Sequence, residues 1–222
     1  MVCPFCFIGK KKMEKAVSRL NANEQVDIIW RSFQLDPDFP MNQSISTSEH
    51  LVQRKGYPLE QVNLMMGQLA NQGKEYGIDF QFDKARSFNT IDAHRLIHWA
   101  KEENKSDELK EALMLYYFTE GSDLSMTDNL MVVIEKVGLD VAKAKEVLTT
   151  NAYAEHVEQD ITQARKLGVR GVPYFLINGK EHISGAQHDS VFENILTAAL
   201  TDQKLADSGN PEGVCIANEE CT

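Results

Sequence analysis

Residues 3–20 read CPFCFIGKKKMEKAVSRL, a Cys-x-x-Cys motif that runs directly into a basic, amphipathic segment. Met13, Val17 and Leu20 recur at helical spacing, which predicts a helix. If Cys3 opens this helix, its sulfur lies over unpaired backbone N–H groups and the positive end of the helix dipole. That position favours the thiolate, the form of cysteine that attacks disulfides and carbonyls.

Composition limits the classes of partner. The length of 222 residues allows one domain with an insertion or two small domains. The net charge is −10 and no basic stripe occurs, so we expect neither nucleic acid nor membrane as a partner. No apolar run approaches the ~18 residues of a membrane span. No signal peptide precedes the motif, and we expect a cytoplasmic protein.

The four cysteines, Cys3, Cys6, Cys215 and Cys221, lie at the two ends of the chain with none between. In a reducing compartment, two such pairs indicate redox chemistry or a metal site. A four-thiolate zinc site is the alternative, but the second pair has C-x5-C spacing, wider than most zinc knuckles use. We therefore expect no metal.

The remaining pattern predicts a strand, a long helical block and a hairpin. Residues 26–33 are apolar and β-branched, which is typical of a strand. Residues 47–168 are nearly all helical in pattern, although 78–82 alternates and is expected to be extended. Residues 172–185 predict a hairpin around Asn178-Gly179, followed by a helix over 191–200. Helix ends are marked by caps and glycines: Thr90, Asp140, Gly77, Gly138 and Gly168.

Five motifs in order carry a resemblance to a known family. They are CPFCFIGK (3–10), FQLDP (33–37), NTIDAHRL (89–96), GVRGVPYFLINGK (168–180) and SGAQ (184–187). Together they resemble the DsbA-like thioredoxin superfamily, specifically its FrnE-like branch. Relatives of this branch include 2-hydroxychromene-2-carboxylate isomerases and kappa-class glutathione transferases.

The resemblance implies an α/β, thioredoxin-like fold with an inserted all-helical domain, in agreement with the pattern of elements. Residues 1–40 and 165–201 would form the split thioredoxin-like domain. Residues 41–164 would form the helical insertion, and residues 202–222 a polar tail that carries the second cysteine pair.

The strand that leads into the Cys-x-x-Cys helix of thioredoxin folds is missing from this chain. Only Met1 and Val2 stand before Cys3, whereas a strand takes about five residues. Its loss would expose two rows of backbone groups and part of the core. We expect the true protein to begin further upstream. The alternative is a truncated form in which another segment or a partner chain fills the vacancy.

The resemblance also implies roles for single residues. Cys3 would be the attacking thiolate and Cys6 the resolving thiol. Pro173 would be a cis-proline opposite the motif, which exposes the backbone of Val172 to a substrate chain that pairs as an added strand. From the residues alone, the simpler interpretation is that Val172 and Pro173 only begin an edge strand.

The presence of both cysteines separates this chain from some relatives. The isomerase and glutathione-transferase relatives typically carry serine at the position of Cys3 and use the thiol of glutathione. We therefore expect a thiol-disulfide oxidoreductase or isomerase that needs no cofactor and acts on protein or small-molecule thiols and disulfides; a homodimer is compatible with this. The alternatives are a glutathione-dependent isomerase or transferase, with glutathione as co-substrate, and a non-catalytic partner-binding or chaperone module.

Pro4 and Phe5, between the cysteines, are expected at the substrate-binding surface. DsbA has a histidine in this pair that helps to stabilise its thiolate, and Phe5 cannot supply that charge. We predict a couple less oxidising than the ~−120 mV of DsbA. Redox titration against glutathione measures the potential, and a value as high as that of DsbA would refute this prediction.

Other polar residues allow two interpretations each. The resemblance places Asn89 and His94 near the cleft between the domains, where they could orient substrate or glutathione; from the residues alone, Asn89 is a helix cap. His94 and His98 could face one metal, but Arg95 stands where a metalloprotease helix has glutamate, and we expect no metal there. Residues 10–12 are expected to be a solvated lysine face.

Cys215 and Cys221 could form an auxiliary redox pair that exchanges electrons with Cys3 and Cys6. On the order of fifteen residues separate residue 200 from Cys215, and such a segment reaches up to ~50 Å. The alternative is a local disulfide staple, or two unused thiols.

Overall fold

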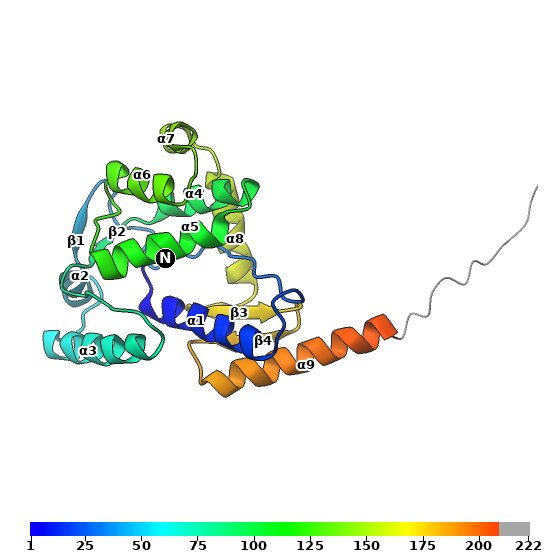
Figure 1. Ribbon diagram of the computed structural model, residues 1–222. Coiled ribbons are helices and arrows are strands. Elements are labelled where there is room, and N and C mark those ends of the chain that lie inside the picture. The colour runs from blue at the N-terminus through cyan, green and yellow to red at the C-terminus, as the bar shows by residue number, and fades with distance from the viewer. Residues whose placement is uncertain (209–222) are drawn as a thin grey trace, which may run out of the picture.

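The computed structural model describes residues 1–208, so Cys215 and Cys221 lie outside the described residues. A larger helical part lies above a smaller part that contains the first helix, a hairpin and the last helix (Figure 1). The helices are α1 (Pro4–Arg19), α2 (Thr47–Gln53), α3 (Leu59–Glu75), α4 (Ile91–Glu102), α5 (Ser106–Leu115), the short π-helix η1 (Tyr116–Glu120), α6 (Thr127–Lys136), α7 (Val141–Thr149), α8 (Ala154–Lys166) and α9 (Asp189–Ser208).

Two small antiparallel sheets complete the described fold. Strand β1 (Ser44–Ser46) pairs with β2 (Arg86–Phe88), and β3 (Tyr174–Ile177) pairs with β4 (Glu181–Ser184). The second pair is the hairpin that Asn178-Gly179 predicts, and both turn residues have positive φ, 50° and 71°. The expected extended segment at residues 78–82 forms no strand, and the β1–β2 ladder was not expected.

Most helix boundaries follow the local cap signals. Asp140 accepts hydrogen bonds from the backbone N–H groups of Ala142 and Lys143 at the start of α7. Gly77 and Gly138 follow α3 and α6 with φ of 72° and 70°, the left-handed conformation that ends a helix. These ends were predicted because a cap acts within one turn of its own helix.

The expected strand over residues 26–33 is wrong for this structure. That segment has no regular secondary structure within the described residues, and β3 pairs with β4 alone. Apolar, β-branched sequence makes a strand only when a neighbouring backbone supplies hydrogen bonds. No backbone is in place between residues 26–33 and β3, because a cavity separates them.

Helix α1 joins two hydrophobic clusters. Phe7 and Ile8, near its start, are fully buried in the larger cluster, which extends through the helical part. Met13 and Val17, further along, pack into the smaller cluster with Phe192 of α9. One helix therefore fixes the beginning of the chain against both parts of the molecule (Figure 1).

The lysines of α1 are not a solvated face, contrary to expectation. Lys10 is only 2% exposed and forms ion pairs with Glu14 and with Glu111 of α5, the latter at 2.7 Å. Lys12 is 5% exposed and donates to the carbonyl oxygen of Gln187 at 2.7 Å. These lysines fasten α1 to α5 and to the start of α9, which sequence periodicity could not show.

Among the described residues, no helix combines the length and hydropathy needed to cross a bilayer.

Candidate active site

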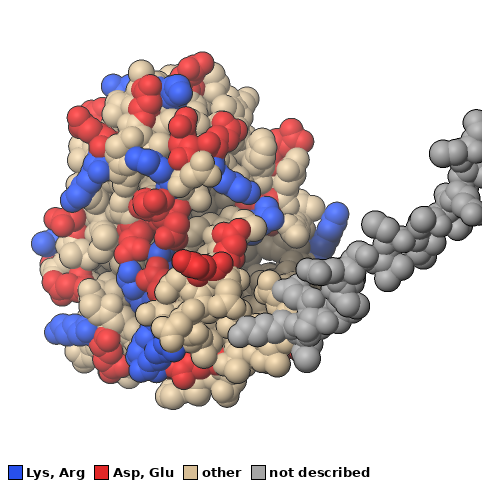
Figure 2. Space-filling model, turned by 45° about the vertical axis from the view of Figure 1, so that its right-hand side comes forward, with Lys and Arg blue, Asp and Glu red and all other residues tan. Residues whose placement is uncertain are grey.

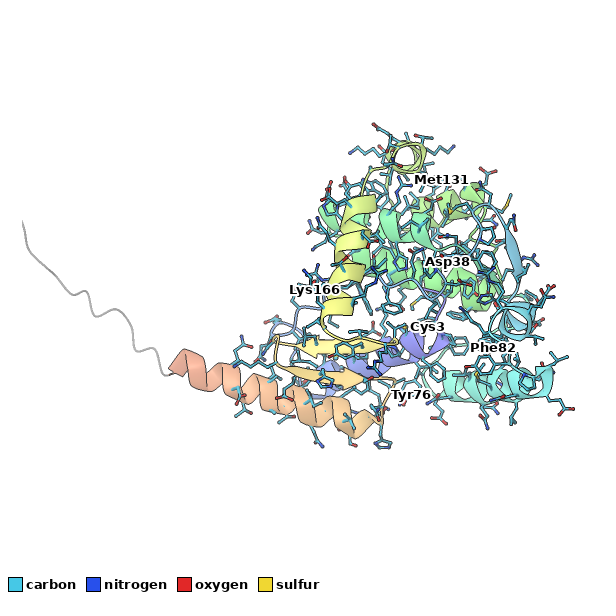
Figure 3. The ribbon with its side chains drawn as sticks, turned by 180° about the vertical axis from the view of Figure 1, so that it is seen from behind. Cys3, Asp38, Tyr76, Phe82, Met131 and Lys166 are labelled. Carbon is cyan, nitrogen blue, oxygen red and sulfur yellow. The ribbon has the colours of Figure 1, made fainter. Side chains whose placement is uncertain are left out.

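The Cys-x-x-Cys motif forms the first turn of α1. Cys3 is the N-cap residue and Pro4 the first helical residue, and the Cys3 carbonyl accepts from the backbone N–H of Cys6 at 3.1 Å. Cys3 is 5% exposed and Cys6 is half-buried. In Figure 3, Cys3 lies between the helical part and the β3–β4 hairpin. Phe5, between the two cysteines in the sequence, is 41% exposed, and its contact with a substrate stays a prediction.

Val172 and Pro173 face the motif from the other side. Their peptide bond is cis, and the Cys3 thiol donates to the Val172 carbonyl over 3.7 Å. A Cβ atom on Gly9 would lie 3.1 Å from both Pro173 and Phe175 side-chain atoms, closer than ordinary contact. Glycine at position 9 therefore lets α1 approach the segment that carries Pro173.

The two thiols form one electrostatic unit. A hydrogen bond from Cys3 lowers the pKa of Cys6 to about 7, with help from the positive charges of the amino terminus and Lys110. The same hydrogen bond, together with burial, raises the pKa of Cys3 well above its usual value. The pair therefore loses its first proton at a pH of about 7 and keeps the second to higher pH. Ionisation is favoured at Cys6, whereas the resemblance assigns the thiolate to Cys3; which sulfur attacks stays a prediction.

A cavity of about 510 Å³ adjoins the dithiol. Cys6, His94 and Lys110 line it near the motif, together with Val172. His94 is 3% exposed, and burial and the nearby positive charges of the amino terminus and Lys110 lower its pKa well below the usual value. His94 is therefore neutral at pH 7 and could act as a hydrogen-bond donor or acceptor, but not as a cation.

Lys110 of α5 is the site residue that sequence reasoning missed. It is 5% exposed, its ammonium lies 4.1 Å from the centre of the Trp30 ring, and within residues 1–208 it has neither an ion pair nor a hydrogen bond. Burial lowers its pKa. The sequence held one signal of its burial. Lys110 stands four residues before buried Met114, and residues four apart lie on the same face of a helix, here the apolar face of α5.

The other predicted residues are placed apart from the cavity. Asn89 accepts from the backbone N–H of Ile91 and donates to the Phe39 carbonyl at 2.7 Å, so it fastens the loop before β1 to the start of α4. It does not line the cavity beside Cys6. His98 bonds to Asp160 and to Ser32, whereas His94 faces the cavity.

Removing the charge of Lys110 tests its effect on the dithiol. In Lys110→Met, the pKa of the first thiol to ionise should rise by about one unit, since an opposite charge at short range shifts a pKa by ~1–3 units. Iodoacetamide alkylation at pH 6 should slow by up to about tenfold. Lys101→Met, which removes an exposed lysine of α4, should leave the rate unchanged. An unaltered alkylation profile in Lys110→Met would show that the lysine is only structural.

A family model of the DSBA-like thioredoxin domain matches residues 1–197, most of the chain. The chain belongs to this family. As a DSBA-like thioredoxin protein it has an α/β, thioredoxin-like fold, as the motifs predicted, and its FrnE-like resemblance agrees with the solved structures that it matches.

The relatives of this DSBA-like protein support the same fold. A probable DsbA oxidoreductase from Streptomyces coelicolor matches with a TM-score of 0.86 and 28% identity, covering 99% of this chain and 92% of that one. A 2-hydroxychromene-2-carboxylate isomerase matches with a TM-score of 0.66 and 18% identity, covering 93% and 94%, which shows the fold alone. The uncharacterized protein YwbO of Bacillus subtilis is 29% identical over 198 residues, covering 88% of this chain and 92% of that protein.

Proposed function

We propose that this protein is a thiol-disulfide oxidoreductase that uses Cys3 and Cys6 on protein or small-molecule thiols and disulfides. One observation carries the proposal: two free thiols stand in the first turn of α1, and the Cys3 thiol contacts the carbonyl group before the cis-proline Pro173. The pKa of Cys6 is lowered to about 7, which agrees with this. A dithiol that is half ionised near neutral pH exchanges readily with disulfides. In a reducing compartment such as the cytoplasm, the pair would be held reduced.

The reaction balances within the dithiol and its substrate. One cysteine thiolate attacks a substrate disulfide, forms a mixed disulfide and expels one substrate thiolate. The second cysteine then attacks the mixed disulfide and releases the other substrate sulfur. The protein loses two electrons and forms the Cys3–Cys6 disulfide, while the substrate gains two electrons and takes up two protons. Run in reverse, the same steps oxidise a substrate dithiol.

Alkylation of the reduced protein across the pH range tests the activated dithiol. The rate should rise with pH around a midpoint of about 7, since only the thiolate reacts and the pKa of Cys6 is lowered to that value. An unperturbed thiol would give a midpoint of ~8.5. Insulin reduction with dithiothreitol as electron donor then measures the activity. A midpoint above 8, or no insulin reduction, would contradict the proposal.

A second candidate is a glutathione-dependent isomerase or transferase, favoured by the cavity with cationic Lys110 at one end. A volume of about 510 Å³ lies in the range of small-molecule sites. Calorimetric titration with glutathione separates the two functions. Saturable binding, with turnover of a small electrophile in the absence of dithiol exchange, would favour the second candidate.

A further inference from the structure

Helix α3 lies at the edge of the molecule, where it packs against α1 and α2 (Figure 1, Figure 3). Its buried residues, Val62, Leu69 and Gly73, share the face that turns inward. The opposite face, here called the outer face of α3, is exposed along its length. It consists of Glu60, Asn63, Leu64, Gly67, Gln68, Asn71 and Lys74. The described part of the chain therefore leaves this side of the helix open to solvent.

Leu64 stands near the middle of the outer face. Its side chain is 64% exposed, the largest value among the large apolar side chains of the described residues. A single exposed leucine is ordinary in a soluble protein, so Leu64 alone does not define a binding surface. Its neighbours on the same face decide whether it belongs to one.

Gly67 lies on the outer face in the interior of α3. A Cβ atom at this position would meet none of the described residues within 4 Å, and the φ of Gly67 is not in the left-handed region. Glycine weakens the interior of a helix relative to alanine, and within the chain neither space nor backbone conformation requires it at position 67. On an exposed face, the missing side chain lets a second helix approach closely.

The charges of the outer face are arranged symmetrically about Gly67. Glu60 stands seven residues before it and Lys74 seven residues after it. Seven residues are about two turns, so all three positions lie along one line of the helix. If two α3 helices pack antiparallel about a two-fold axis at Gly67, Glu60 of each copy lies opposite Lys74 of the other. A parallel pair would place like charges opposite each other.

The uncharged residues fit the same antiparallel arrangement. Leu64 of one copy lies opposite Ala70 of the other, so that a large side chain meets a small one. Asn63 lies opposite Asn71, and two amides can donate to and accept from each other. In a two-fold contact every such match occurs twice, which makes the outer face complementary to a second copy of itself.

The rest of the surface gives no comparable preference for another class of partner. Acidic and basic side chains are intermixed over the side of the molecule drawn in Figure 2. An oppositely charged partner is therefore not specified there, whereas the match of Glu60 with Lys74 specifies a second α3 helix.

We propose that the outer face of α3 is the interface of a homodimer, in which two α3 helices pack antiparallel with Gly67 at the two-fold axis. Each helix has 17 residues, a length of ~26 Å. A contact between two such helices lies below the ~1,200 Å² that stable complexes bury. The dimer is therefore transient, and its population rises with protein concentration.

A disulfide across the two-fold axis tests the dimer. Gly67→Cys and Asn71→Cys are each made in a background in which all four native cysteines are replaced by serine, and both are oxidised under the same conditions. In the proposed dimer the two copies of position 67 meet at the axis, whereas the two copies of position 71 are ~12 Å apart along it, beyond the ~7 Å that a disulfide spans. Gly67→Cys should therefore form a covalent dimer about tenfold faster or more. The background has no dithiol, so the result does not depend on the proposed oxidoreductase activity.

The two variants also show what would overturn the proposal. Equal rates would do so, because a parallel pair brings both positions together and random collision favours neither. Absence of a covalent dimer in Gly67→Cys would also do so, since position 67 lies on the axis itself.

Sedimentation equilibrium then measures the contribution of Leu64 in the chain with its native cysteines reduced. Leu64→Glu should raise the dissociation constant of the dimer about tenfold or more, since it removes the apolar contact and adds a charge on each copy. Gln61→Glu makes the same change of charge at an exposed position of α3 that lies off the outer face, and it should leave the constant unchanged. Equal constants for both variants would contradict an interface at Leu64.

Reversal of the charges tests the antiparallel register. Glu60→Lys and Lys74→Glu should each weaken the dimer, because each places like charges opposite one another across the axis. The double variant re-forms both ion pairs with the signs exchanged and should restore the dissociation constant. A double variant as weak as the sum of the single variants would show that positions 60 and 74 do not meet.

Discussion

Replacement of either Cys3 or Cys6 by serine is expected to reduce the rate of insulin reduction at least a hundredfold. A single thiol can form a mixed disulfide but cannot resolve it, so turnover stops after one step. The assay compares each variant with the parent in a background of Cys215→Ser and Cys221→Ser. That background protein is itself compared with the wild type. Loss of activity in the background protein would show that the second pair takes part in turnover.

The same variants decide which sulfur attacks. The variant that retains the attacking cysteine should accumulate a mixed disulfide with a small aromatic disulfide, and intact mass measures the adduct. The resemblance predicts the adduct in Cys6→Ser, whereas the lowered pKa of Cys6 favours its formation in Cys3→Ser. Adducts in neither variant would contradict dithiol exchange at this site.

The elements that could be predicted from sequence are those whose signals are local. The helix of residues 141–149 carries its own cap, Asp140, and the hairpin carries its own turn, Asn178-Gly179. The segment at residues 26–33 has the composition of a strand. A strand also needs a second backbone segment to pair with, and the local sequence does not show whether one is present. The wrong strand and the cavity therefore have one common cause, the lack of a backbone between residues 26–33 and β3.

The residues of the candidate site also differ in whether a local signal marks them. Cys3 and Cys6 could be found because their spacing is itself the chemical signal. Lys110 could not, because its position beside the dithiol depends on how α5 packs against α1 and on contact with Trp30, 80 residues earlier. A lysine on an apolar helix face is ordinarily taken to extend to solvent along its aliphatic stem. In this protein the ammonium group of Lys110 is buried and lies against the ring of Trp30.

Asp160→Asn is expected to lower the free energy of unfolding by about 3 kcal/mol, the range measured when one partner of a buried ion pair is removed. The carboxylate of Asp160 is 4% exposed and accepts from the backbone N–H of Ser32 at 2.7 Å. It also binds His98 at 3.0 Å and Arg31 at 3.1 Å. It thereby ties residues 31–32, which line the cavity beside the dithiol, to α8 and α4. Urea denaturation followed by circular dichroism measures the change.

Glu158→Gln on the same helix is the matched control. Glu158 is exposed and its contact with Arg165 spans 3.4 Å, so its replacement should change the free energy of unfolding by less than ~0.5 kcal/mol. A comparable loss in both variants would show that α8 tolerates no change of charge, and the buried carboxylate would then have no special role.

The pH dependence of this difference identifies the charge of Asp160 as its source. Burial acts to raise the pKa of Asp160, but the hydrogen bonds from His98 and Ser32 and the charge of Arg31 outweigh it, and the pKa is lowered. A carboxyl with a lowered folded-state pKa stabilises the protein above its unfolded pKa of ~3.9 and loses that contribution as the pH falls through the folded value. The difference in unfolding free energy between wild type and Asp160→Asn should therefore narrow as the pH falls below 4. A difference that stays the same at pH 3 would mean that the shape of the carboxyl group, and not its charge, holds residues 31–32 in place.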